Sequence, residues 1–149
     1  MSEIEVVHDY PQPPALVWRA LTDPSVVPRW TATGLGGSPK GFAPVVGTRF
    51  EYVTKPNAFF RGLVECEVLE AREPALLKHT WVGDDDGEAT TVTWRIDARE
   101  GGSRLTYTHA GFHGIGGFFV SRVLARVRRK MLAEGLPPVL DQLAKEDAS

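Results

Sequence analysis

A change in the spacing of apolar residues constrains this fold more than any other feature of the sequence. Over residues 47–111 apolar and polar side chains alternate; Val92, Trp94 and Ile96, for example, are separated by polar residues. Such alternation predicts β-strands with one apolar face. From Phe119 onwards the apolar residues recur every three or four positions, which predicts an amphipathic helix. Strands followed by one long helix indicate an α+β fold in which the helix covers the apolar face of the sheet.

Six strands are predicted, and tight turns join several of them. They are expected at Ile4–Tyr10, Thr48–Thr54, Phe60–Ala71, Leu77–Trp81, Thr91–Ala98 and Ser103–Ala110. The turn formers Asp84–Gly87 and Gly101–Gly102 lie between strands, so the strands that they join must be antiparallel neighbours. Residues 34–44 are rich in glycine and proline and predict a loop.

Two short helices are expected between the first and second strands. Pro13 and Pro14 suit the opening turn of a helix over Ala15–Leu21, because proline needs no hydrogen-bond donor there. A second helix is predicted to begin at Asp23 and to run towards Trp30.

The final helix separates apolar from basic residues. Its apolar stripe is predicted to contain Phe119, Val120, Val123, Leu124, Val127 and Met131. The basic residues Arg122, Arg126, Arg128, Arg129 and Lys130 are expected on a solvated face. Gly135 and Pro137–Pro138 are predicted to break or kink this helix, since proline lacks the donor that a helix interior uses.

Composition limits the classes of function. The chain has 149 residues, which suits one domain spanning residues 1–149. A formal net charge of −2 argues against nucleic acid as a partner. The apolar stretches are too short for a membrane span, and the single cysteine, Cys66, can form no internal disulfide. A cytoplasmic protein is therefore expected.

Several motifs in order resemble those of a known superfamily. Trp18-Arg19-Ala20-Leu21-Thr22-Asp23-Pro24 followed by Trp30 is similar to its W-x-A-L-T-D-P…W motif, and Leu105-Thr106-Tyr107-Thr108-His109-Ala110-Gly111-Phe112 is similar to its last strand. The chain thereby resembles the SRPBCC superfamily (START, Bet v 1, polyketide cyclase). Its nearest likeness there is to the branch homologous to the activator of the heat-shock-protein-90 ATPase. The resemblance implies a helix-grip fold, with a curved antiparallel sheet of six strands around a long C-terminal helix.

This fold leaves space between sheet and helix, and the inward side chains are mostly aromatic or aliphatic. We expect a binding site there for a small apolar ligand, lined by Trp30, Phe50, Tyr52, Phe60, Val64, Cys66, His79, Trp81, Trp94, Tyr107, His109, Phe119, Val123, Val127 and Met131. The alternative is that these side chains fill the interior by packing against one another, as in ordinary protein cores.

Two histidines are expected on the inward face. His79 alternates in phase with Leu77 and Trp81, and His109 with Tyr107. Both should lie beside Val92, one strand to either side and about 10 Å apart. That separation is too large for a shared metal ion, so no metal or cofactor is predicted. The pair would instead offer hydrogen bonds to the oxygen atoms of a ligand.

Three functions follow from these expectations. The first is a carrier or sensor for a lipid, an isoprenoid or an aromatic polyketide-like molecule, with no catalytic residues. The second, which the resemblance implies, is a polyketide cyclase or dehydratase in which His79, His109 or Tyr107 moves protons. The third is a protein-binding role like that of the chaperone activator, for which the sequence offers no separate support.

Overall fold

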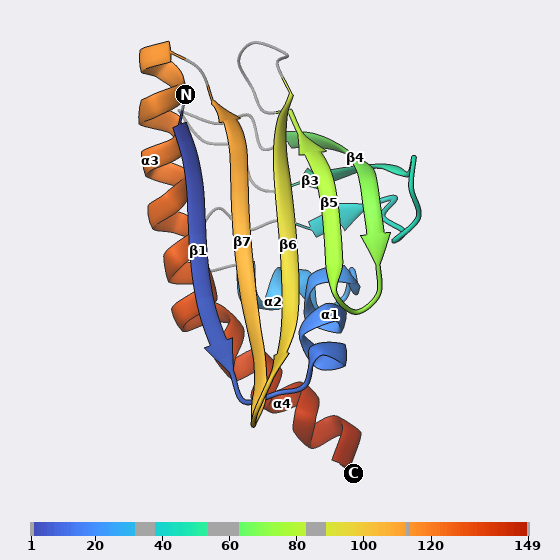
Figure 1. The fold of residues 1–149 in the computed structure, drawn as a ribbon. Helices are drawn as coiled ribbons and strands as arrows, with labels where there is room; N and C mark the ends of the chain where they lie inside the picture. The colour runs from blue at the N-terminus through green and yellow to red at the C-terminus, as the bar shows by residue number, and fades with distance from the viewer. Residues whose placement is uncertain (1, 32–37, 54–62, 83–88, 113, 149) are drawn as a thin grey trace.

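The computed structural model describes residues 2–31, 38–53, 63–82, 89–112 and 114–148, which form one antiparallel sheet with helices behind it (Figure 1). The elements in chain order are β1 (Ser2–Tyr10), α1 (Pro14–Thr22), α2 (Val27–Thr31), β2 (Ser38–Lys40), β3 (Arg49–Val53), β4 (Leu63–Arg72), β5 (Leu76–Trp81), β6 (Thr90–Arg99), β7 (Gly102–Phe112), α3 (Gly114–Lys130), η1 (Met131–Gly135) and α4 (Leu136–Ala148). The predicted helix-grip fold is confirmed. The predicted turn at residues 84–87 and the predicted strand start at Phe60 lie outside the described residues.

The sheet has one strand more than the sequence predicted. Within the described residues its seven strands run in the order β1-β7-β6-β5-β4-β3-β2, and every neighbouring pair is antiparallel. The additional strand, β2, pairs with β3 through Ser38↔Val53 and Lys40↔Glu51. Three residues cannot establish an alternating pattern, and Pro39 with its glycine-rich surroundings favours a loop. The expected loop at residues 34–44 is therefore wrong at this short strand.

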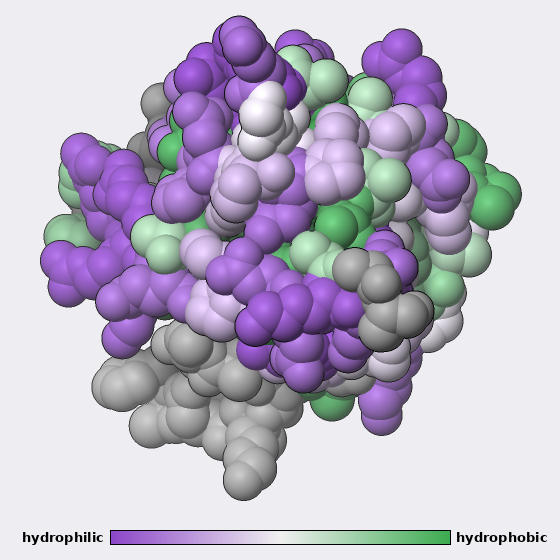
Figure 2. Space-filling view, turned by 90° about the horizontal axis from the view of Figure 1, so that it is seen from below, coloured by the Kyte–Doolittle hydropathy of each residue, from purple (hydrophilic) through white to green (hydrophobic). Residues whose placement is uncertain are grey.

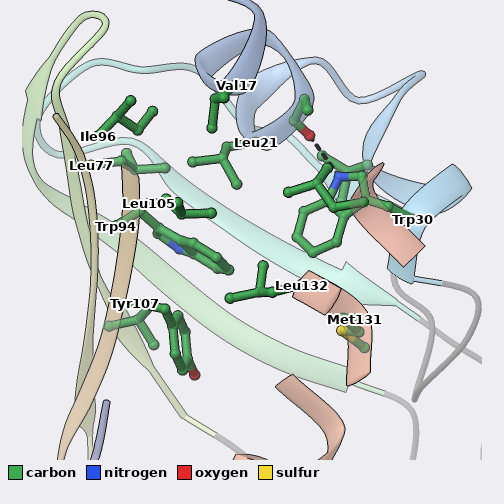
Figure 3. Close-up of a cluster of buried hydrophobic side chains, with 14 of the residues drawn as sticks. Val17, Leu21, Trp30, Leu77, Trp94, Ile96, Leu105, Tyr107, Met131 and Leu132 are labelled. Atoms are coloured by element: carbon green, nitrogen blue, oxygen red, sulfur yellow. Dashed lines mark hydrogen bonds between the residues drawn. The ribbon is translucent and has the colours of Figure 1, made fainter. Parts of the chain in front are cut away.

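One end of the sheet carries a well-packed apolar core. There α1, α2 and η1 lie against the sheet and contribute Val17, Trp30 and Leu132, all buried (Figure 3). The indole of Trp30 meets that of Trp94 edge-on, with ring centroids 6.1 Å apart, and Nε1 of Trp30 donates a hydrogen bond of 2.8 Å to the carbonyl oxygen of Ala20. This bond satisfies the polar atom of a fully enclosed side chain, so the core keeps its apolar character.

The C-terminal helix changes direction without ending. After α3 the backbone forms a π-helical turn, η1, in which the N–H of Leu136 bonds to the carbonyl oxygen of Met131, five residues back. The chain then continues as α4 at a different angle (Figure 1). The wider turn accommodates Pro137 and Pro138, which cannot donate to the carbonyl groups of a regular α-helix. The predicted kink is therefore present at this point.

The predicted apolar stripe of the final helix is only partly correct: Leu124 and Met131 are buried and Val127 is partly buried, whereas the side chain of Val120 lies outside the described residues. Helix α3 packs mainly on β1 and β7, and among its described side chains those of Ser121, Leu124, Ala125 and Arg128 are buried. Phe119 and Val123 were expected to face inward, but each is 62% exposed. The small side chains of Ser121 and Ala125 face β1, where they line a hollow together with Ile4, and the bulky side chains of Phe119 and Val123 are exposed.

The end of the molecule away from the exposed apolar residues of α3 has a mainly hydrophilic surface. Figure 2 shows the end at which the β6–β7 hairpin and α4 lie, and hydrophilic residues cover much of this face. Among the described helices, none combines the length and the apolar character that crossing a bilayer requires.

Candidate ligand-binding site

The strand register brings the two predicted histidines to the positions expected from alternation. His79 of β5 pairs with Val92 of β6, and Val92 pairs with His109 of β7. Both imidazoles are fully buried, at 0% exposure. They therefore lie in one row across the inner face of the sheet, one strand to either side of Val92.

Protein groups engage both ring nitrogens of His79. Nδ1 lies 2.8 Å from the carbonyl oxygen of Thr80, which can only accept, so Nδ1 carries the proton. Nε2 then accepts the indole N–H of Trp94 at 3.2 Å. Burial lowers the pKa of His79 to about 4, since desolvation disfavours the charged imidazole. At neutral pH this histidine is uncharged and protein groups engage both of its nitrogens; its hydrogen bond to a ligand stays a prediction.

His109 belongs to a chain of hydrogen bonds whose direction is fixed. The hydroxyl of Thr90 donates to the carbonyl oxygen of Trp81 at 3.0 Å, so it must accept from Nε2–H of His109 at 2.7 Å. Nδ1 of His109 is then unprotonated and accepts the Tyr107 hydroxyl at 3.0 Å. Burial, aided by the positive charge of Arg128, lowers the pKa of His109 to about 3. This imidazole is also neutral and fully engaged.

Aromatic rings form a continuous wall around these histidines. The ring centroids of Tyr52 and Trp81 lie 5.9 Å apart, and those of Trp94 and Tyr107 lie 4.7 Å apart. Trp81 also meets His109 at 5.4 Å. Such spacings are typical of favourable edge-on and offset ring contacts. Tyr52 and Trp81 are only partly buried, so the wall keeps some accessible aromatic surface.

Arg128 is the most important residue that the sequence analysis misplaced. Expected on the solvated face of the helix, it is only 7% exposed. Its guanidinium carbon lies 5.2 Å from the ring centre of Trp81, 5.6 Å from that of Trp94 and 5.3 Å from that of Tyr107. The sequence did contain one indication that Arg128 is buried. It lies four residues after Leu124 and three before Met131, which are both buried, and residues at these spacings share one helix face.

Cys66 lies deep in the interior beside these aromatic residues. It pairs with Phe50 across β3 and β4 and is 5% exposed. Burial raises the pKa of its thiol to about 12, because the thiolate would be poorly solvated there. The thiol is therefore protonated and acts as a small apolar side chain.

The structure places most of the predicted site residues between the sheet and the helices. Those with buried or partly buried side chains are Trp30, Phe50, Tyr52, Val64, Cys66, His79, Trp81, Trp94, Tyr107, His109, Val127 and Met131. Most of these residues also belong to the hydrophobic core: Trp30, Phe50, Val64, Cys66, Trp94, Tyr107 and Met131 are members of it, and Tyr52, Trp81 and Val127 pack against it. Phe119 and Val123 lie on the surface, and Phe60 lies outside the described residues. In the part of the chain that the structure describes, no three His, Cys, Asp or Glu side chains are grouped as metal ligands would be.

This arrangement, a bent antiparallel sheet whose inner face meets a kinked C-terminal helix, defines a helix-grip domain of the SRPBCC type. The chain belongs to the family described as "Activator of Hsp90 ATPase homolog 1-like protein", whose model matches residues 11–146. The family resemblance inferred from the tryptophan motif and the last strand is thereby confirmed. No curated protein matches the sequence.

Solved structures with the same fold come from distant organisms. A protein from Mesorhizobium loti has a TM-score of 0.76 and 24% identity, with 95% of this chain and 98% of that chain covered. A protein from Rhodobacter sphaeroides has a TM-score of 0.77 and 24% identity, with 95% and 93% covered. An HSP90 activator from Plasmodium falciparum has a TM-score of 0.69 and 20% identity, with 97% of each chain covered. At these identities the similarity establishes the fold alone.

Proposed function

We propose that this chain binds a small apolar molecule, such as a lipid, an isoprenoid or an aromatic polyketide-like compound, between the sheet and the C-terminal helix. The observation that carries the proposal is the aromatic wall with accessible surface at Tyr52 and Trp81. Binding sites for small molecules are typically apolar and aromatic, with a few polar groups that fix orientation. The wall has this composition.

The distribution of bulky side chains along the interior supports the same proposal. Where α1, α2 and η1 face the sheet, large apolar residues such as Trp30 and Leu132 fill the interior (Figure 3). Farther along, α3 contributes the small residues Ser121 and Ala125, while Phe119 points outward. Opposite the aromatic wall, α3 supplies the guanidinium of Arg128 rather than a bulky apolar side chain, and a ligand would supply further apolar contacts.

Catalysis is less well supported than binding. A polyketide cyclase-like enzyme would need an imidazole or a phenol that can exchange protons with its substrate. Both nitrogens of His79 and both nitrogens of His109 already bond to protein groups, and both histidines have pKa values well below neutrality. These features favour a carrier or a sensor.

A second candidate function, binding to a chaperone partner, is favoured by a separate observation. Phe118, Phe119 and Val123 expose apolar surface together on α3, at 44%, 62% and 62%. The family description and the Plasmodium activator give this surface a plausible use. The test is stimulation of a chaperone ATPase by the wild-type chain and its loss in Phe119→Ser. If the chain has no effect on the ATPase, this candidate fails.

Ligand binding is tested with two matched substitutions on α3. Val127 is partly buried, whereas Val123, one turn earlier, is exposed. Native mass spectrometry of protein purified from its own host should detect a bound molecule in the wild type and in Val123→Trp. Val127→Trp should exclude it, because the indole would occupy the interior. The wild type is also tested for thermal stabilisation by two apolar probes, Nile red and naphthalene-2-carboxamide. The proposal is refuted if the wild type carries no added mass and neither probe stabilises it.

A further inference from the structure

The buried guanidinium of Arg128 has an unusual set of neighbours. Three aromatic rings, those of Trp81, Trp94 and Tyr107, lie within 5.6 Å of its central carbon. Nη1 donates to a weak acceptor, Sδ of Met131, at 3.5 Å, and the guanidinium also interacts with the Tyr107 hydroxyl. Nε is buried and has no hydrogen-bond partner among the described residues. A strong donor is thus left unsatisfied inside the protein.

No carboxylate of the described residues forms a salt bridge with Arg128. Buried charges in proteins are normally paired, because removing an ion from water is costly and attraction to an opposite charge offsets that cost. The aromatic faces compensate only in part through cation–π attraction. Arginine cannot lower the cost by losing its proton, as lysine can. The site is therefore electrostatically incomplete within the described chain.

The other titratable groups around Arg128 do not supply the missing negative charge. Burial keeps Cys66, Tyr52 and Tyr107 protonated by raising the pKa of each. His79 and His109 are neutral because their pKa values are lowered to about 4 and 3. In the part of the interior that the structure describes, these residues leave Arg128 as a single positive charge among neutral groups.

We propose that Arg128 binds the carboxylate of an amphipathic ligand whose apolar body lies against Trp81 and Tyr52. The inference rests on the proposed ligand-binding function and names the chemical class of that ligand, a monocarboxylic acid with an aromatic or aliphatic body. A guanidinium recognises a carboxylate through parallel N–H···O bonds, and Nε and Nη atoms provide them. One positive charge between apolar walls matches one carboxylate better than a phosphate, which carries more charge and needs more donors.

The test compares two probes of nearly the same shape, naphthalene-2-carboxylate and naphthalene-2-carboxamide, at pH 7.5. Binding is measured by calorimetry and by the fluorescence of the tryptophans that line the site. The variant is Arg128→Met, which keeps an unbranched apolar stem and removes the charge. Arg129→Met is the matched control, because Arg129 is the next residue on the same helix and is exposed.

The wild type and Arg129→Met should bind the carboxylate at least tenfold more tightly than the amide. Arg128→Met should lose this preference and keep its affinity for the amide. Equal binding of both probes by the wild type, or an unchanged preference in Arg128→Met, would overturn the role of Arg128 and leave the ligand-binding function standing. If the wild type binds neither probe, the carboxylate proposal fails, whereas the ligand-binding function is refuted only if native mass spectrometry shows no added mass and Nile red gives no stabilisation.

Thermal unfolding of the ligand-free variants provides a second readout. Without a bound carboxylate the buried guanidinium is unpaired, which destabilises the folded protein. Arg128→Met should therefore unfold at a higher temperature than the wild type. Arg129→Met should unfold at nearly the wild-type temperature. A lower unfolding temperature for Arg128→Met would mean that the guanidinium supports the aromatic wall, and would count against a ligand-binding role.

Discussion

The hydroxyl of Tyr107 lies 3.0 Å from Nδ1 of His109, two residues farther along the same strand. Because side chains at i and i+2 point to the same face of a strand, both are enclosed between sheet and helix. The bond links Tyr107, which lies beneath the guanidinium of Arg128, to the chain of hydrogen bonds that ends at the carbonyl of Trp81. Tyr107, His109, Thr90 and the carbonyl group of Trp81 thus form one connected series of hydrogen bonds.

Replacing Tyr107 with Phe should destabilise the protein. The substitution leaves Nδ1 of His109 buried without a donor, and an unsatisfied buried acceptor costs about 1–3 kcal/mol. Urea unfolding measures the loss. Thr108→Val is the control, since Thr108 lies on the opposite face of the same strand and is only partly buried; it should change stability by less than about 0.5 kcal/mol. Equal stability of Tyr107→Phe and the wild type would contradict the inferred bond.

Stability should fall as the pH drops below about 6.5, well before most carboxylates titrate. His79 and His109 have pKa values of about 4 and 3 in the folded protein, against about 6.5 when unfolded. Between these values the unfolded chain binds more protons, so acid favours unfolding. The slope should approach about 1.4 kcal/mol per pH unit for each histidine.

Urea unfolding at pH 7.5, 6.5, 5.5 and 4.5 measures this dependence. His79→Gln should reduce the slope by about half, because one of the two buried imidazoles is removed. A free energy of unfolding that stays constant from pH 7.5 to 4.5 would show that the histidines are not buried in neutral form.

Two neighbouring residues on α3 test which face of the helix packs inward. Leu124 is 7% exposed and Val123 is 62% exposed. Leu124→Ala should cost about 2–4 kcal/mol, because it removes buried methyl groups and leaves a cavity. Val123→Ala should change the free energy of unfolding by less than about 0.5 kcal/mol. The opposite result would show that Val123, and not Leu124, packs against the sheet.

Cys66 should resist modification in the folded protein. Its thiol is buried and has a pKa raised to about 12, so very little reactive thiolate forms at pH 8. Ellman's reagent should react slowly with the native protein and rapidly in about 6 M guanidinium chloride, which unfolds the chain and exposes the thiol. The chain has one cysteine, so the signal reports this site alone. Rapid reaction without denaturant would show that solvent reaches the interior freely.

Local sequence patterns were sufficient for much of the fold and part of the site. Strand alternation placed His79 and His109 on either side of Val92, because turns and side-chain period together fix register. The patterns failed at β2, which is too short for a period, and at α3, where the largest apolar residues do not face the sheet. Hydrophobicity predicts which residues favour burial, whereas the side chains of α3 that face β1 include the small ones of Ser121 and Ala125.

The sequence by itself determined the element order, the antiparallel pairing and the inward positions of the two histidines, since each follows from local spacing along the chain. Only the tertiary structure decided the rotation of α3 about its axis and the resulting burial of Arg128. That rotation depends on how closely the helix approaches β1, a contact between residues about 120 positions apart that no local periodicity encodes. The burial of the positive charge of Arg128 in the proposed site therefore depends on the packing of the helix against the sheet.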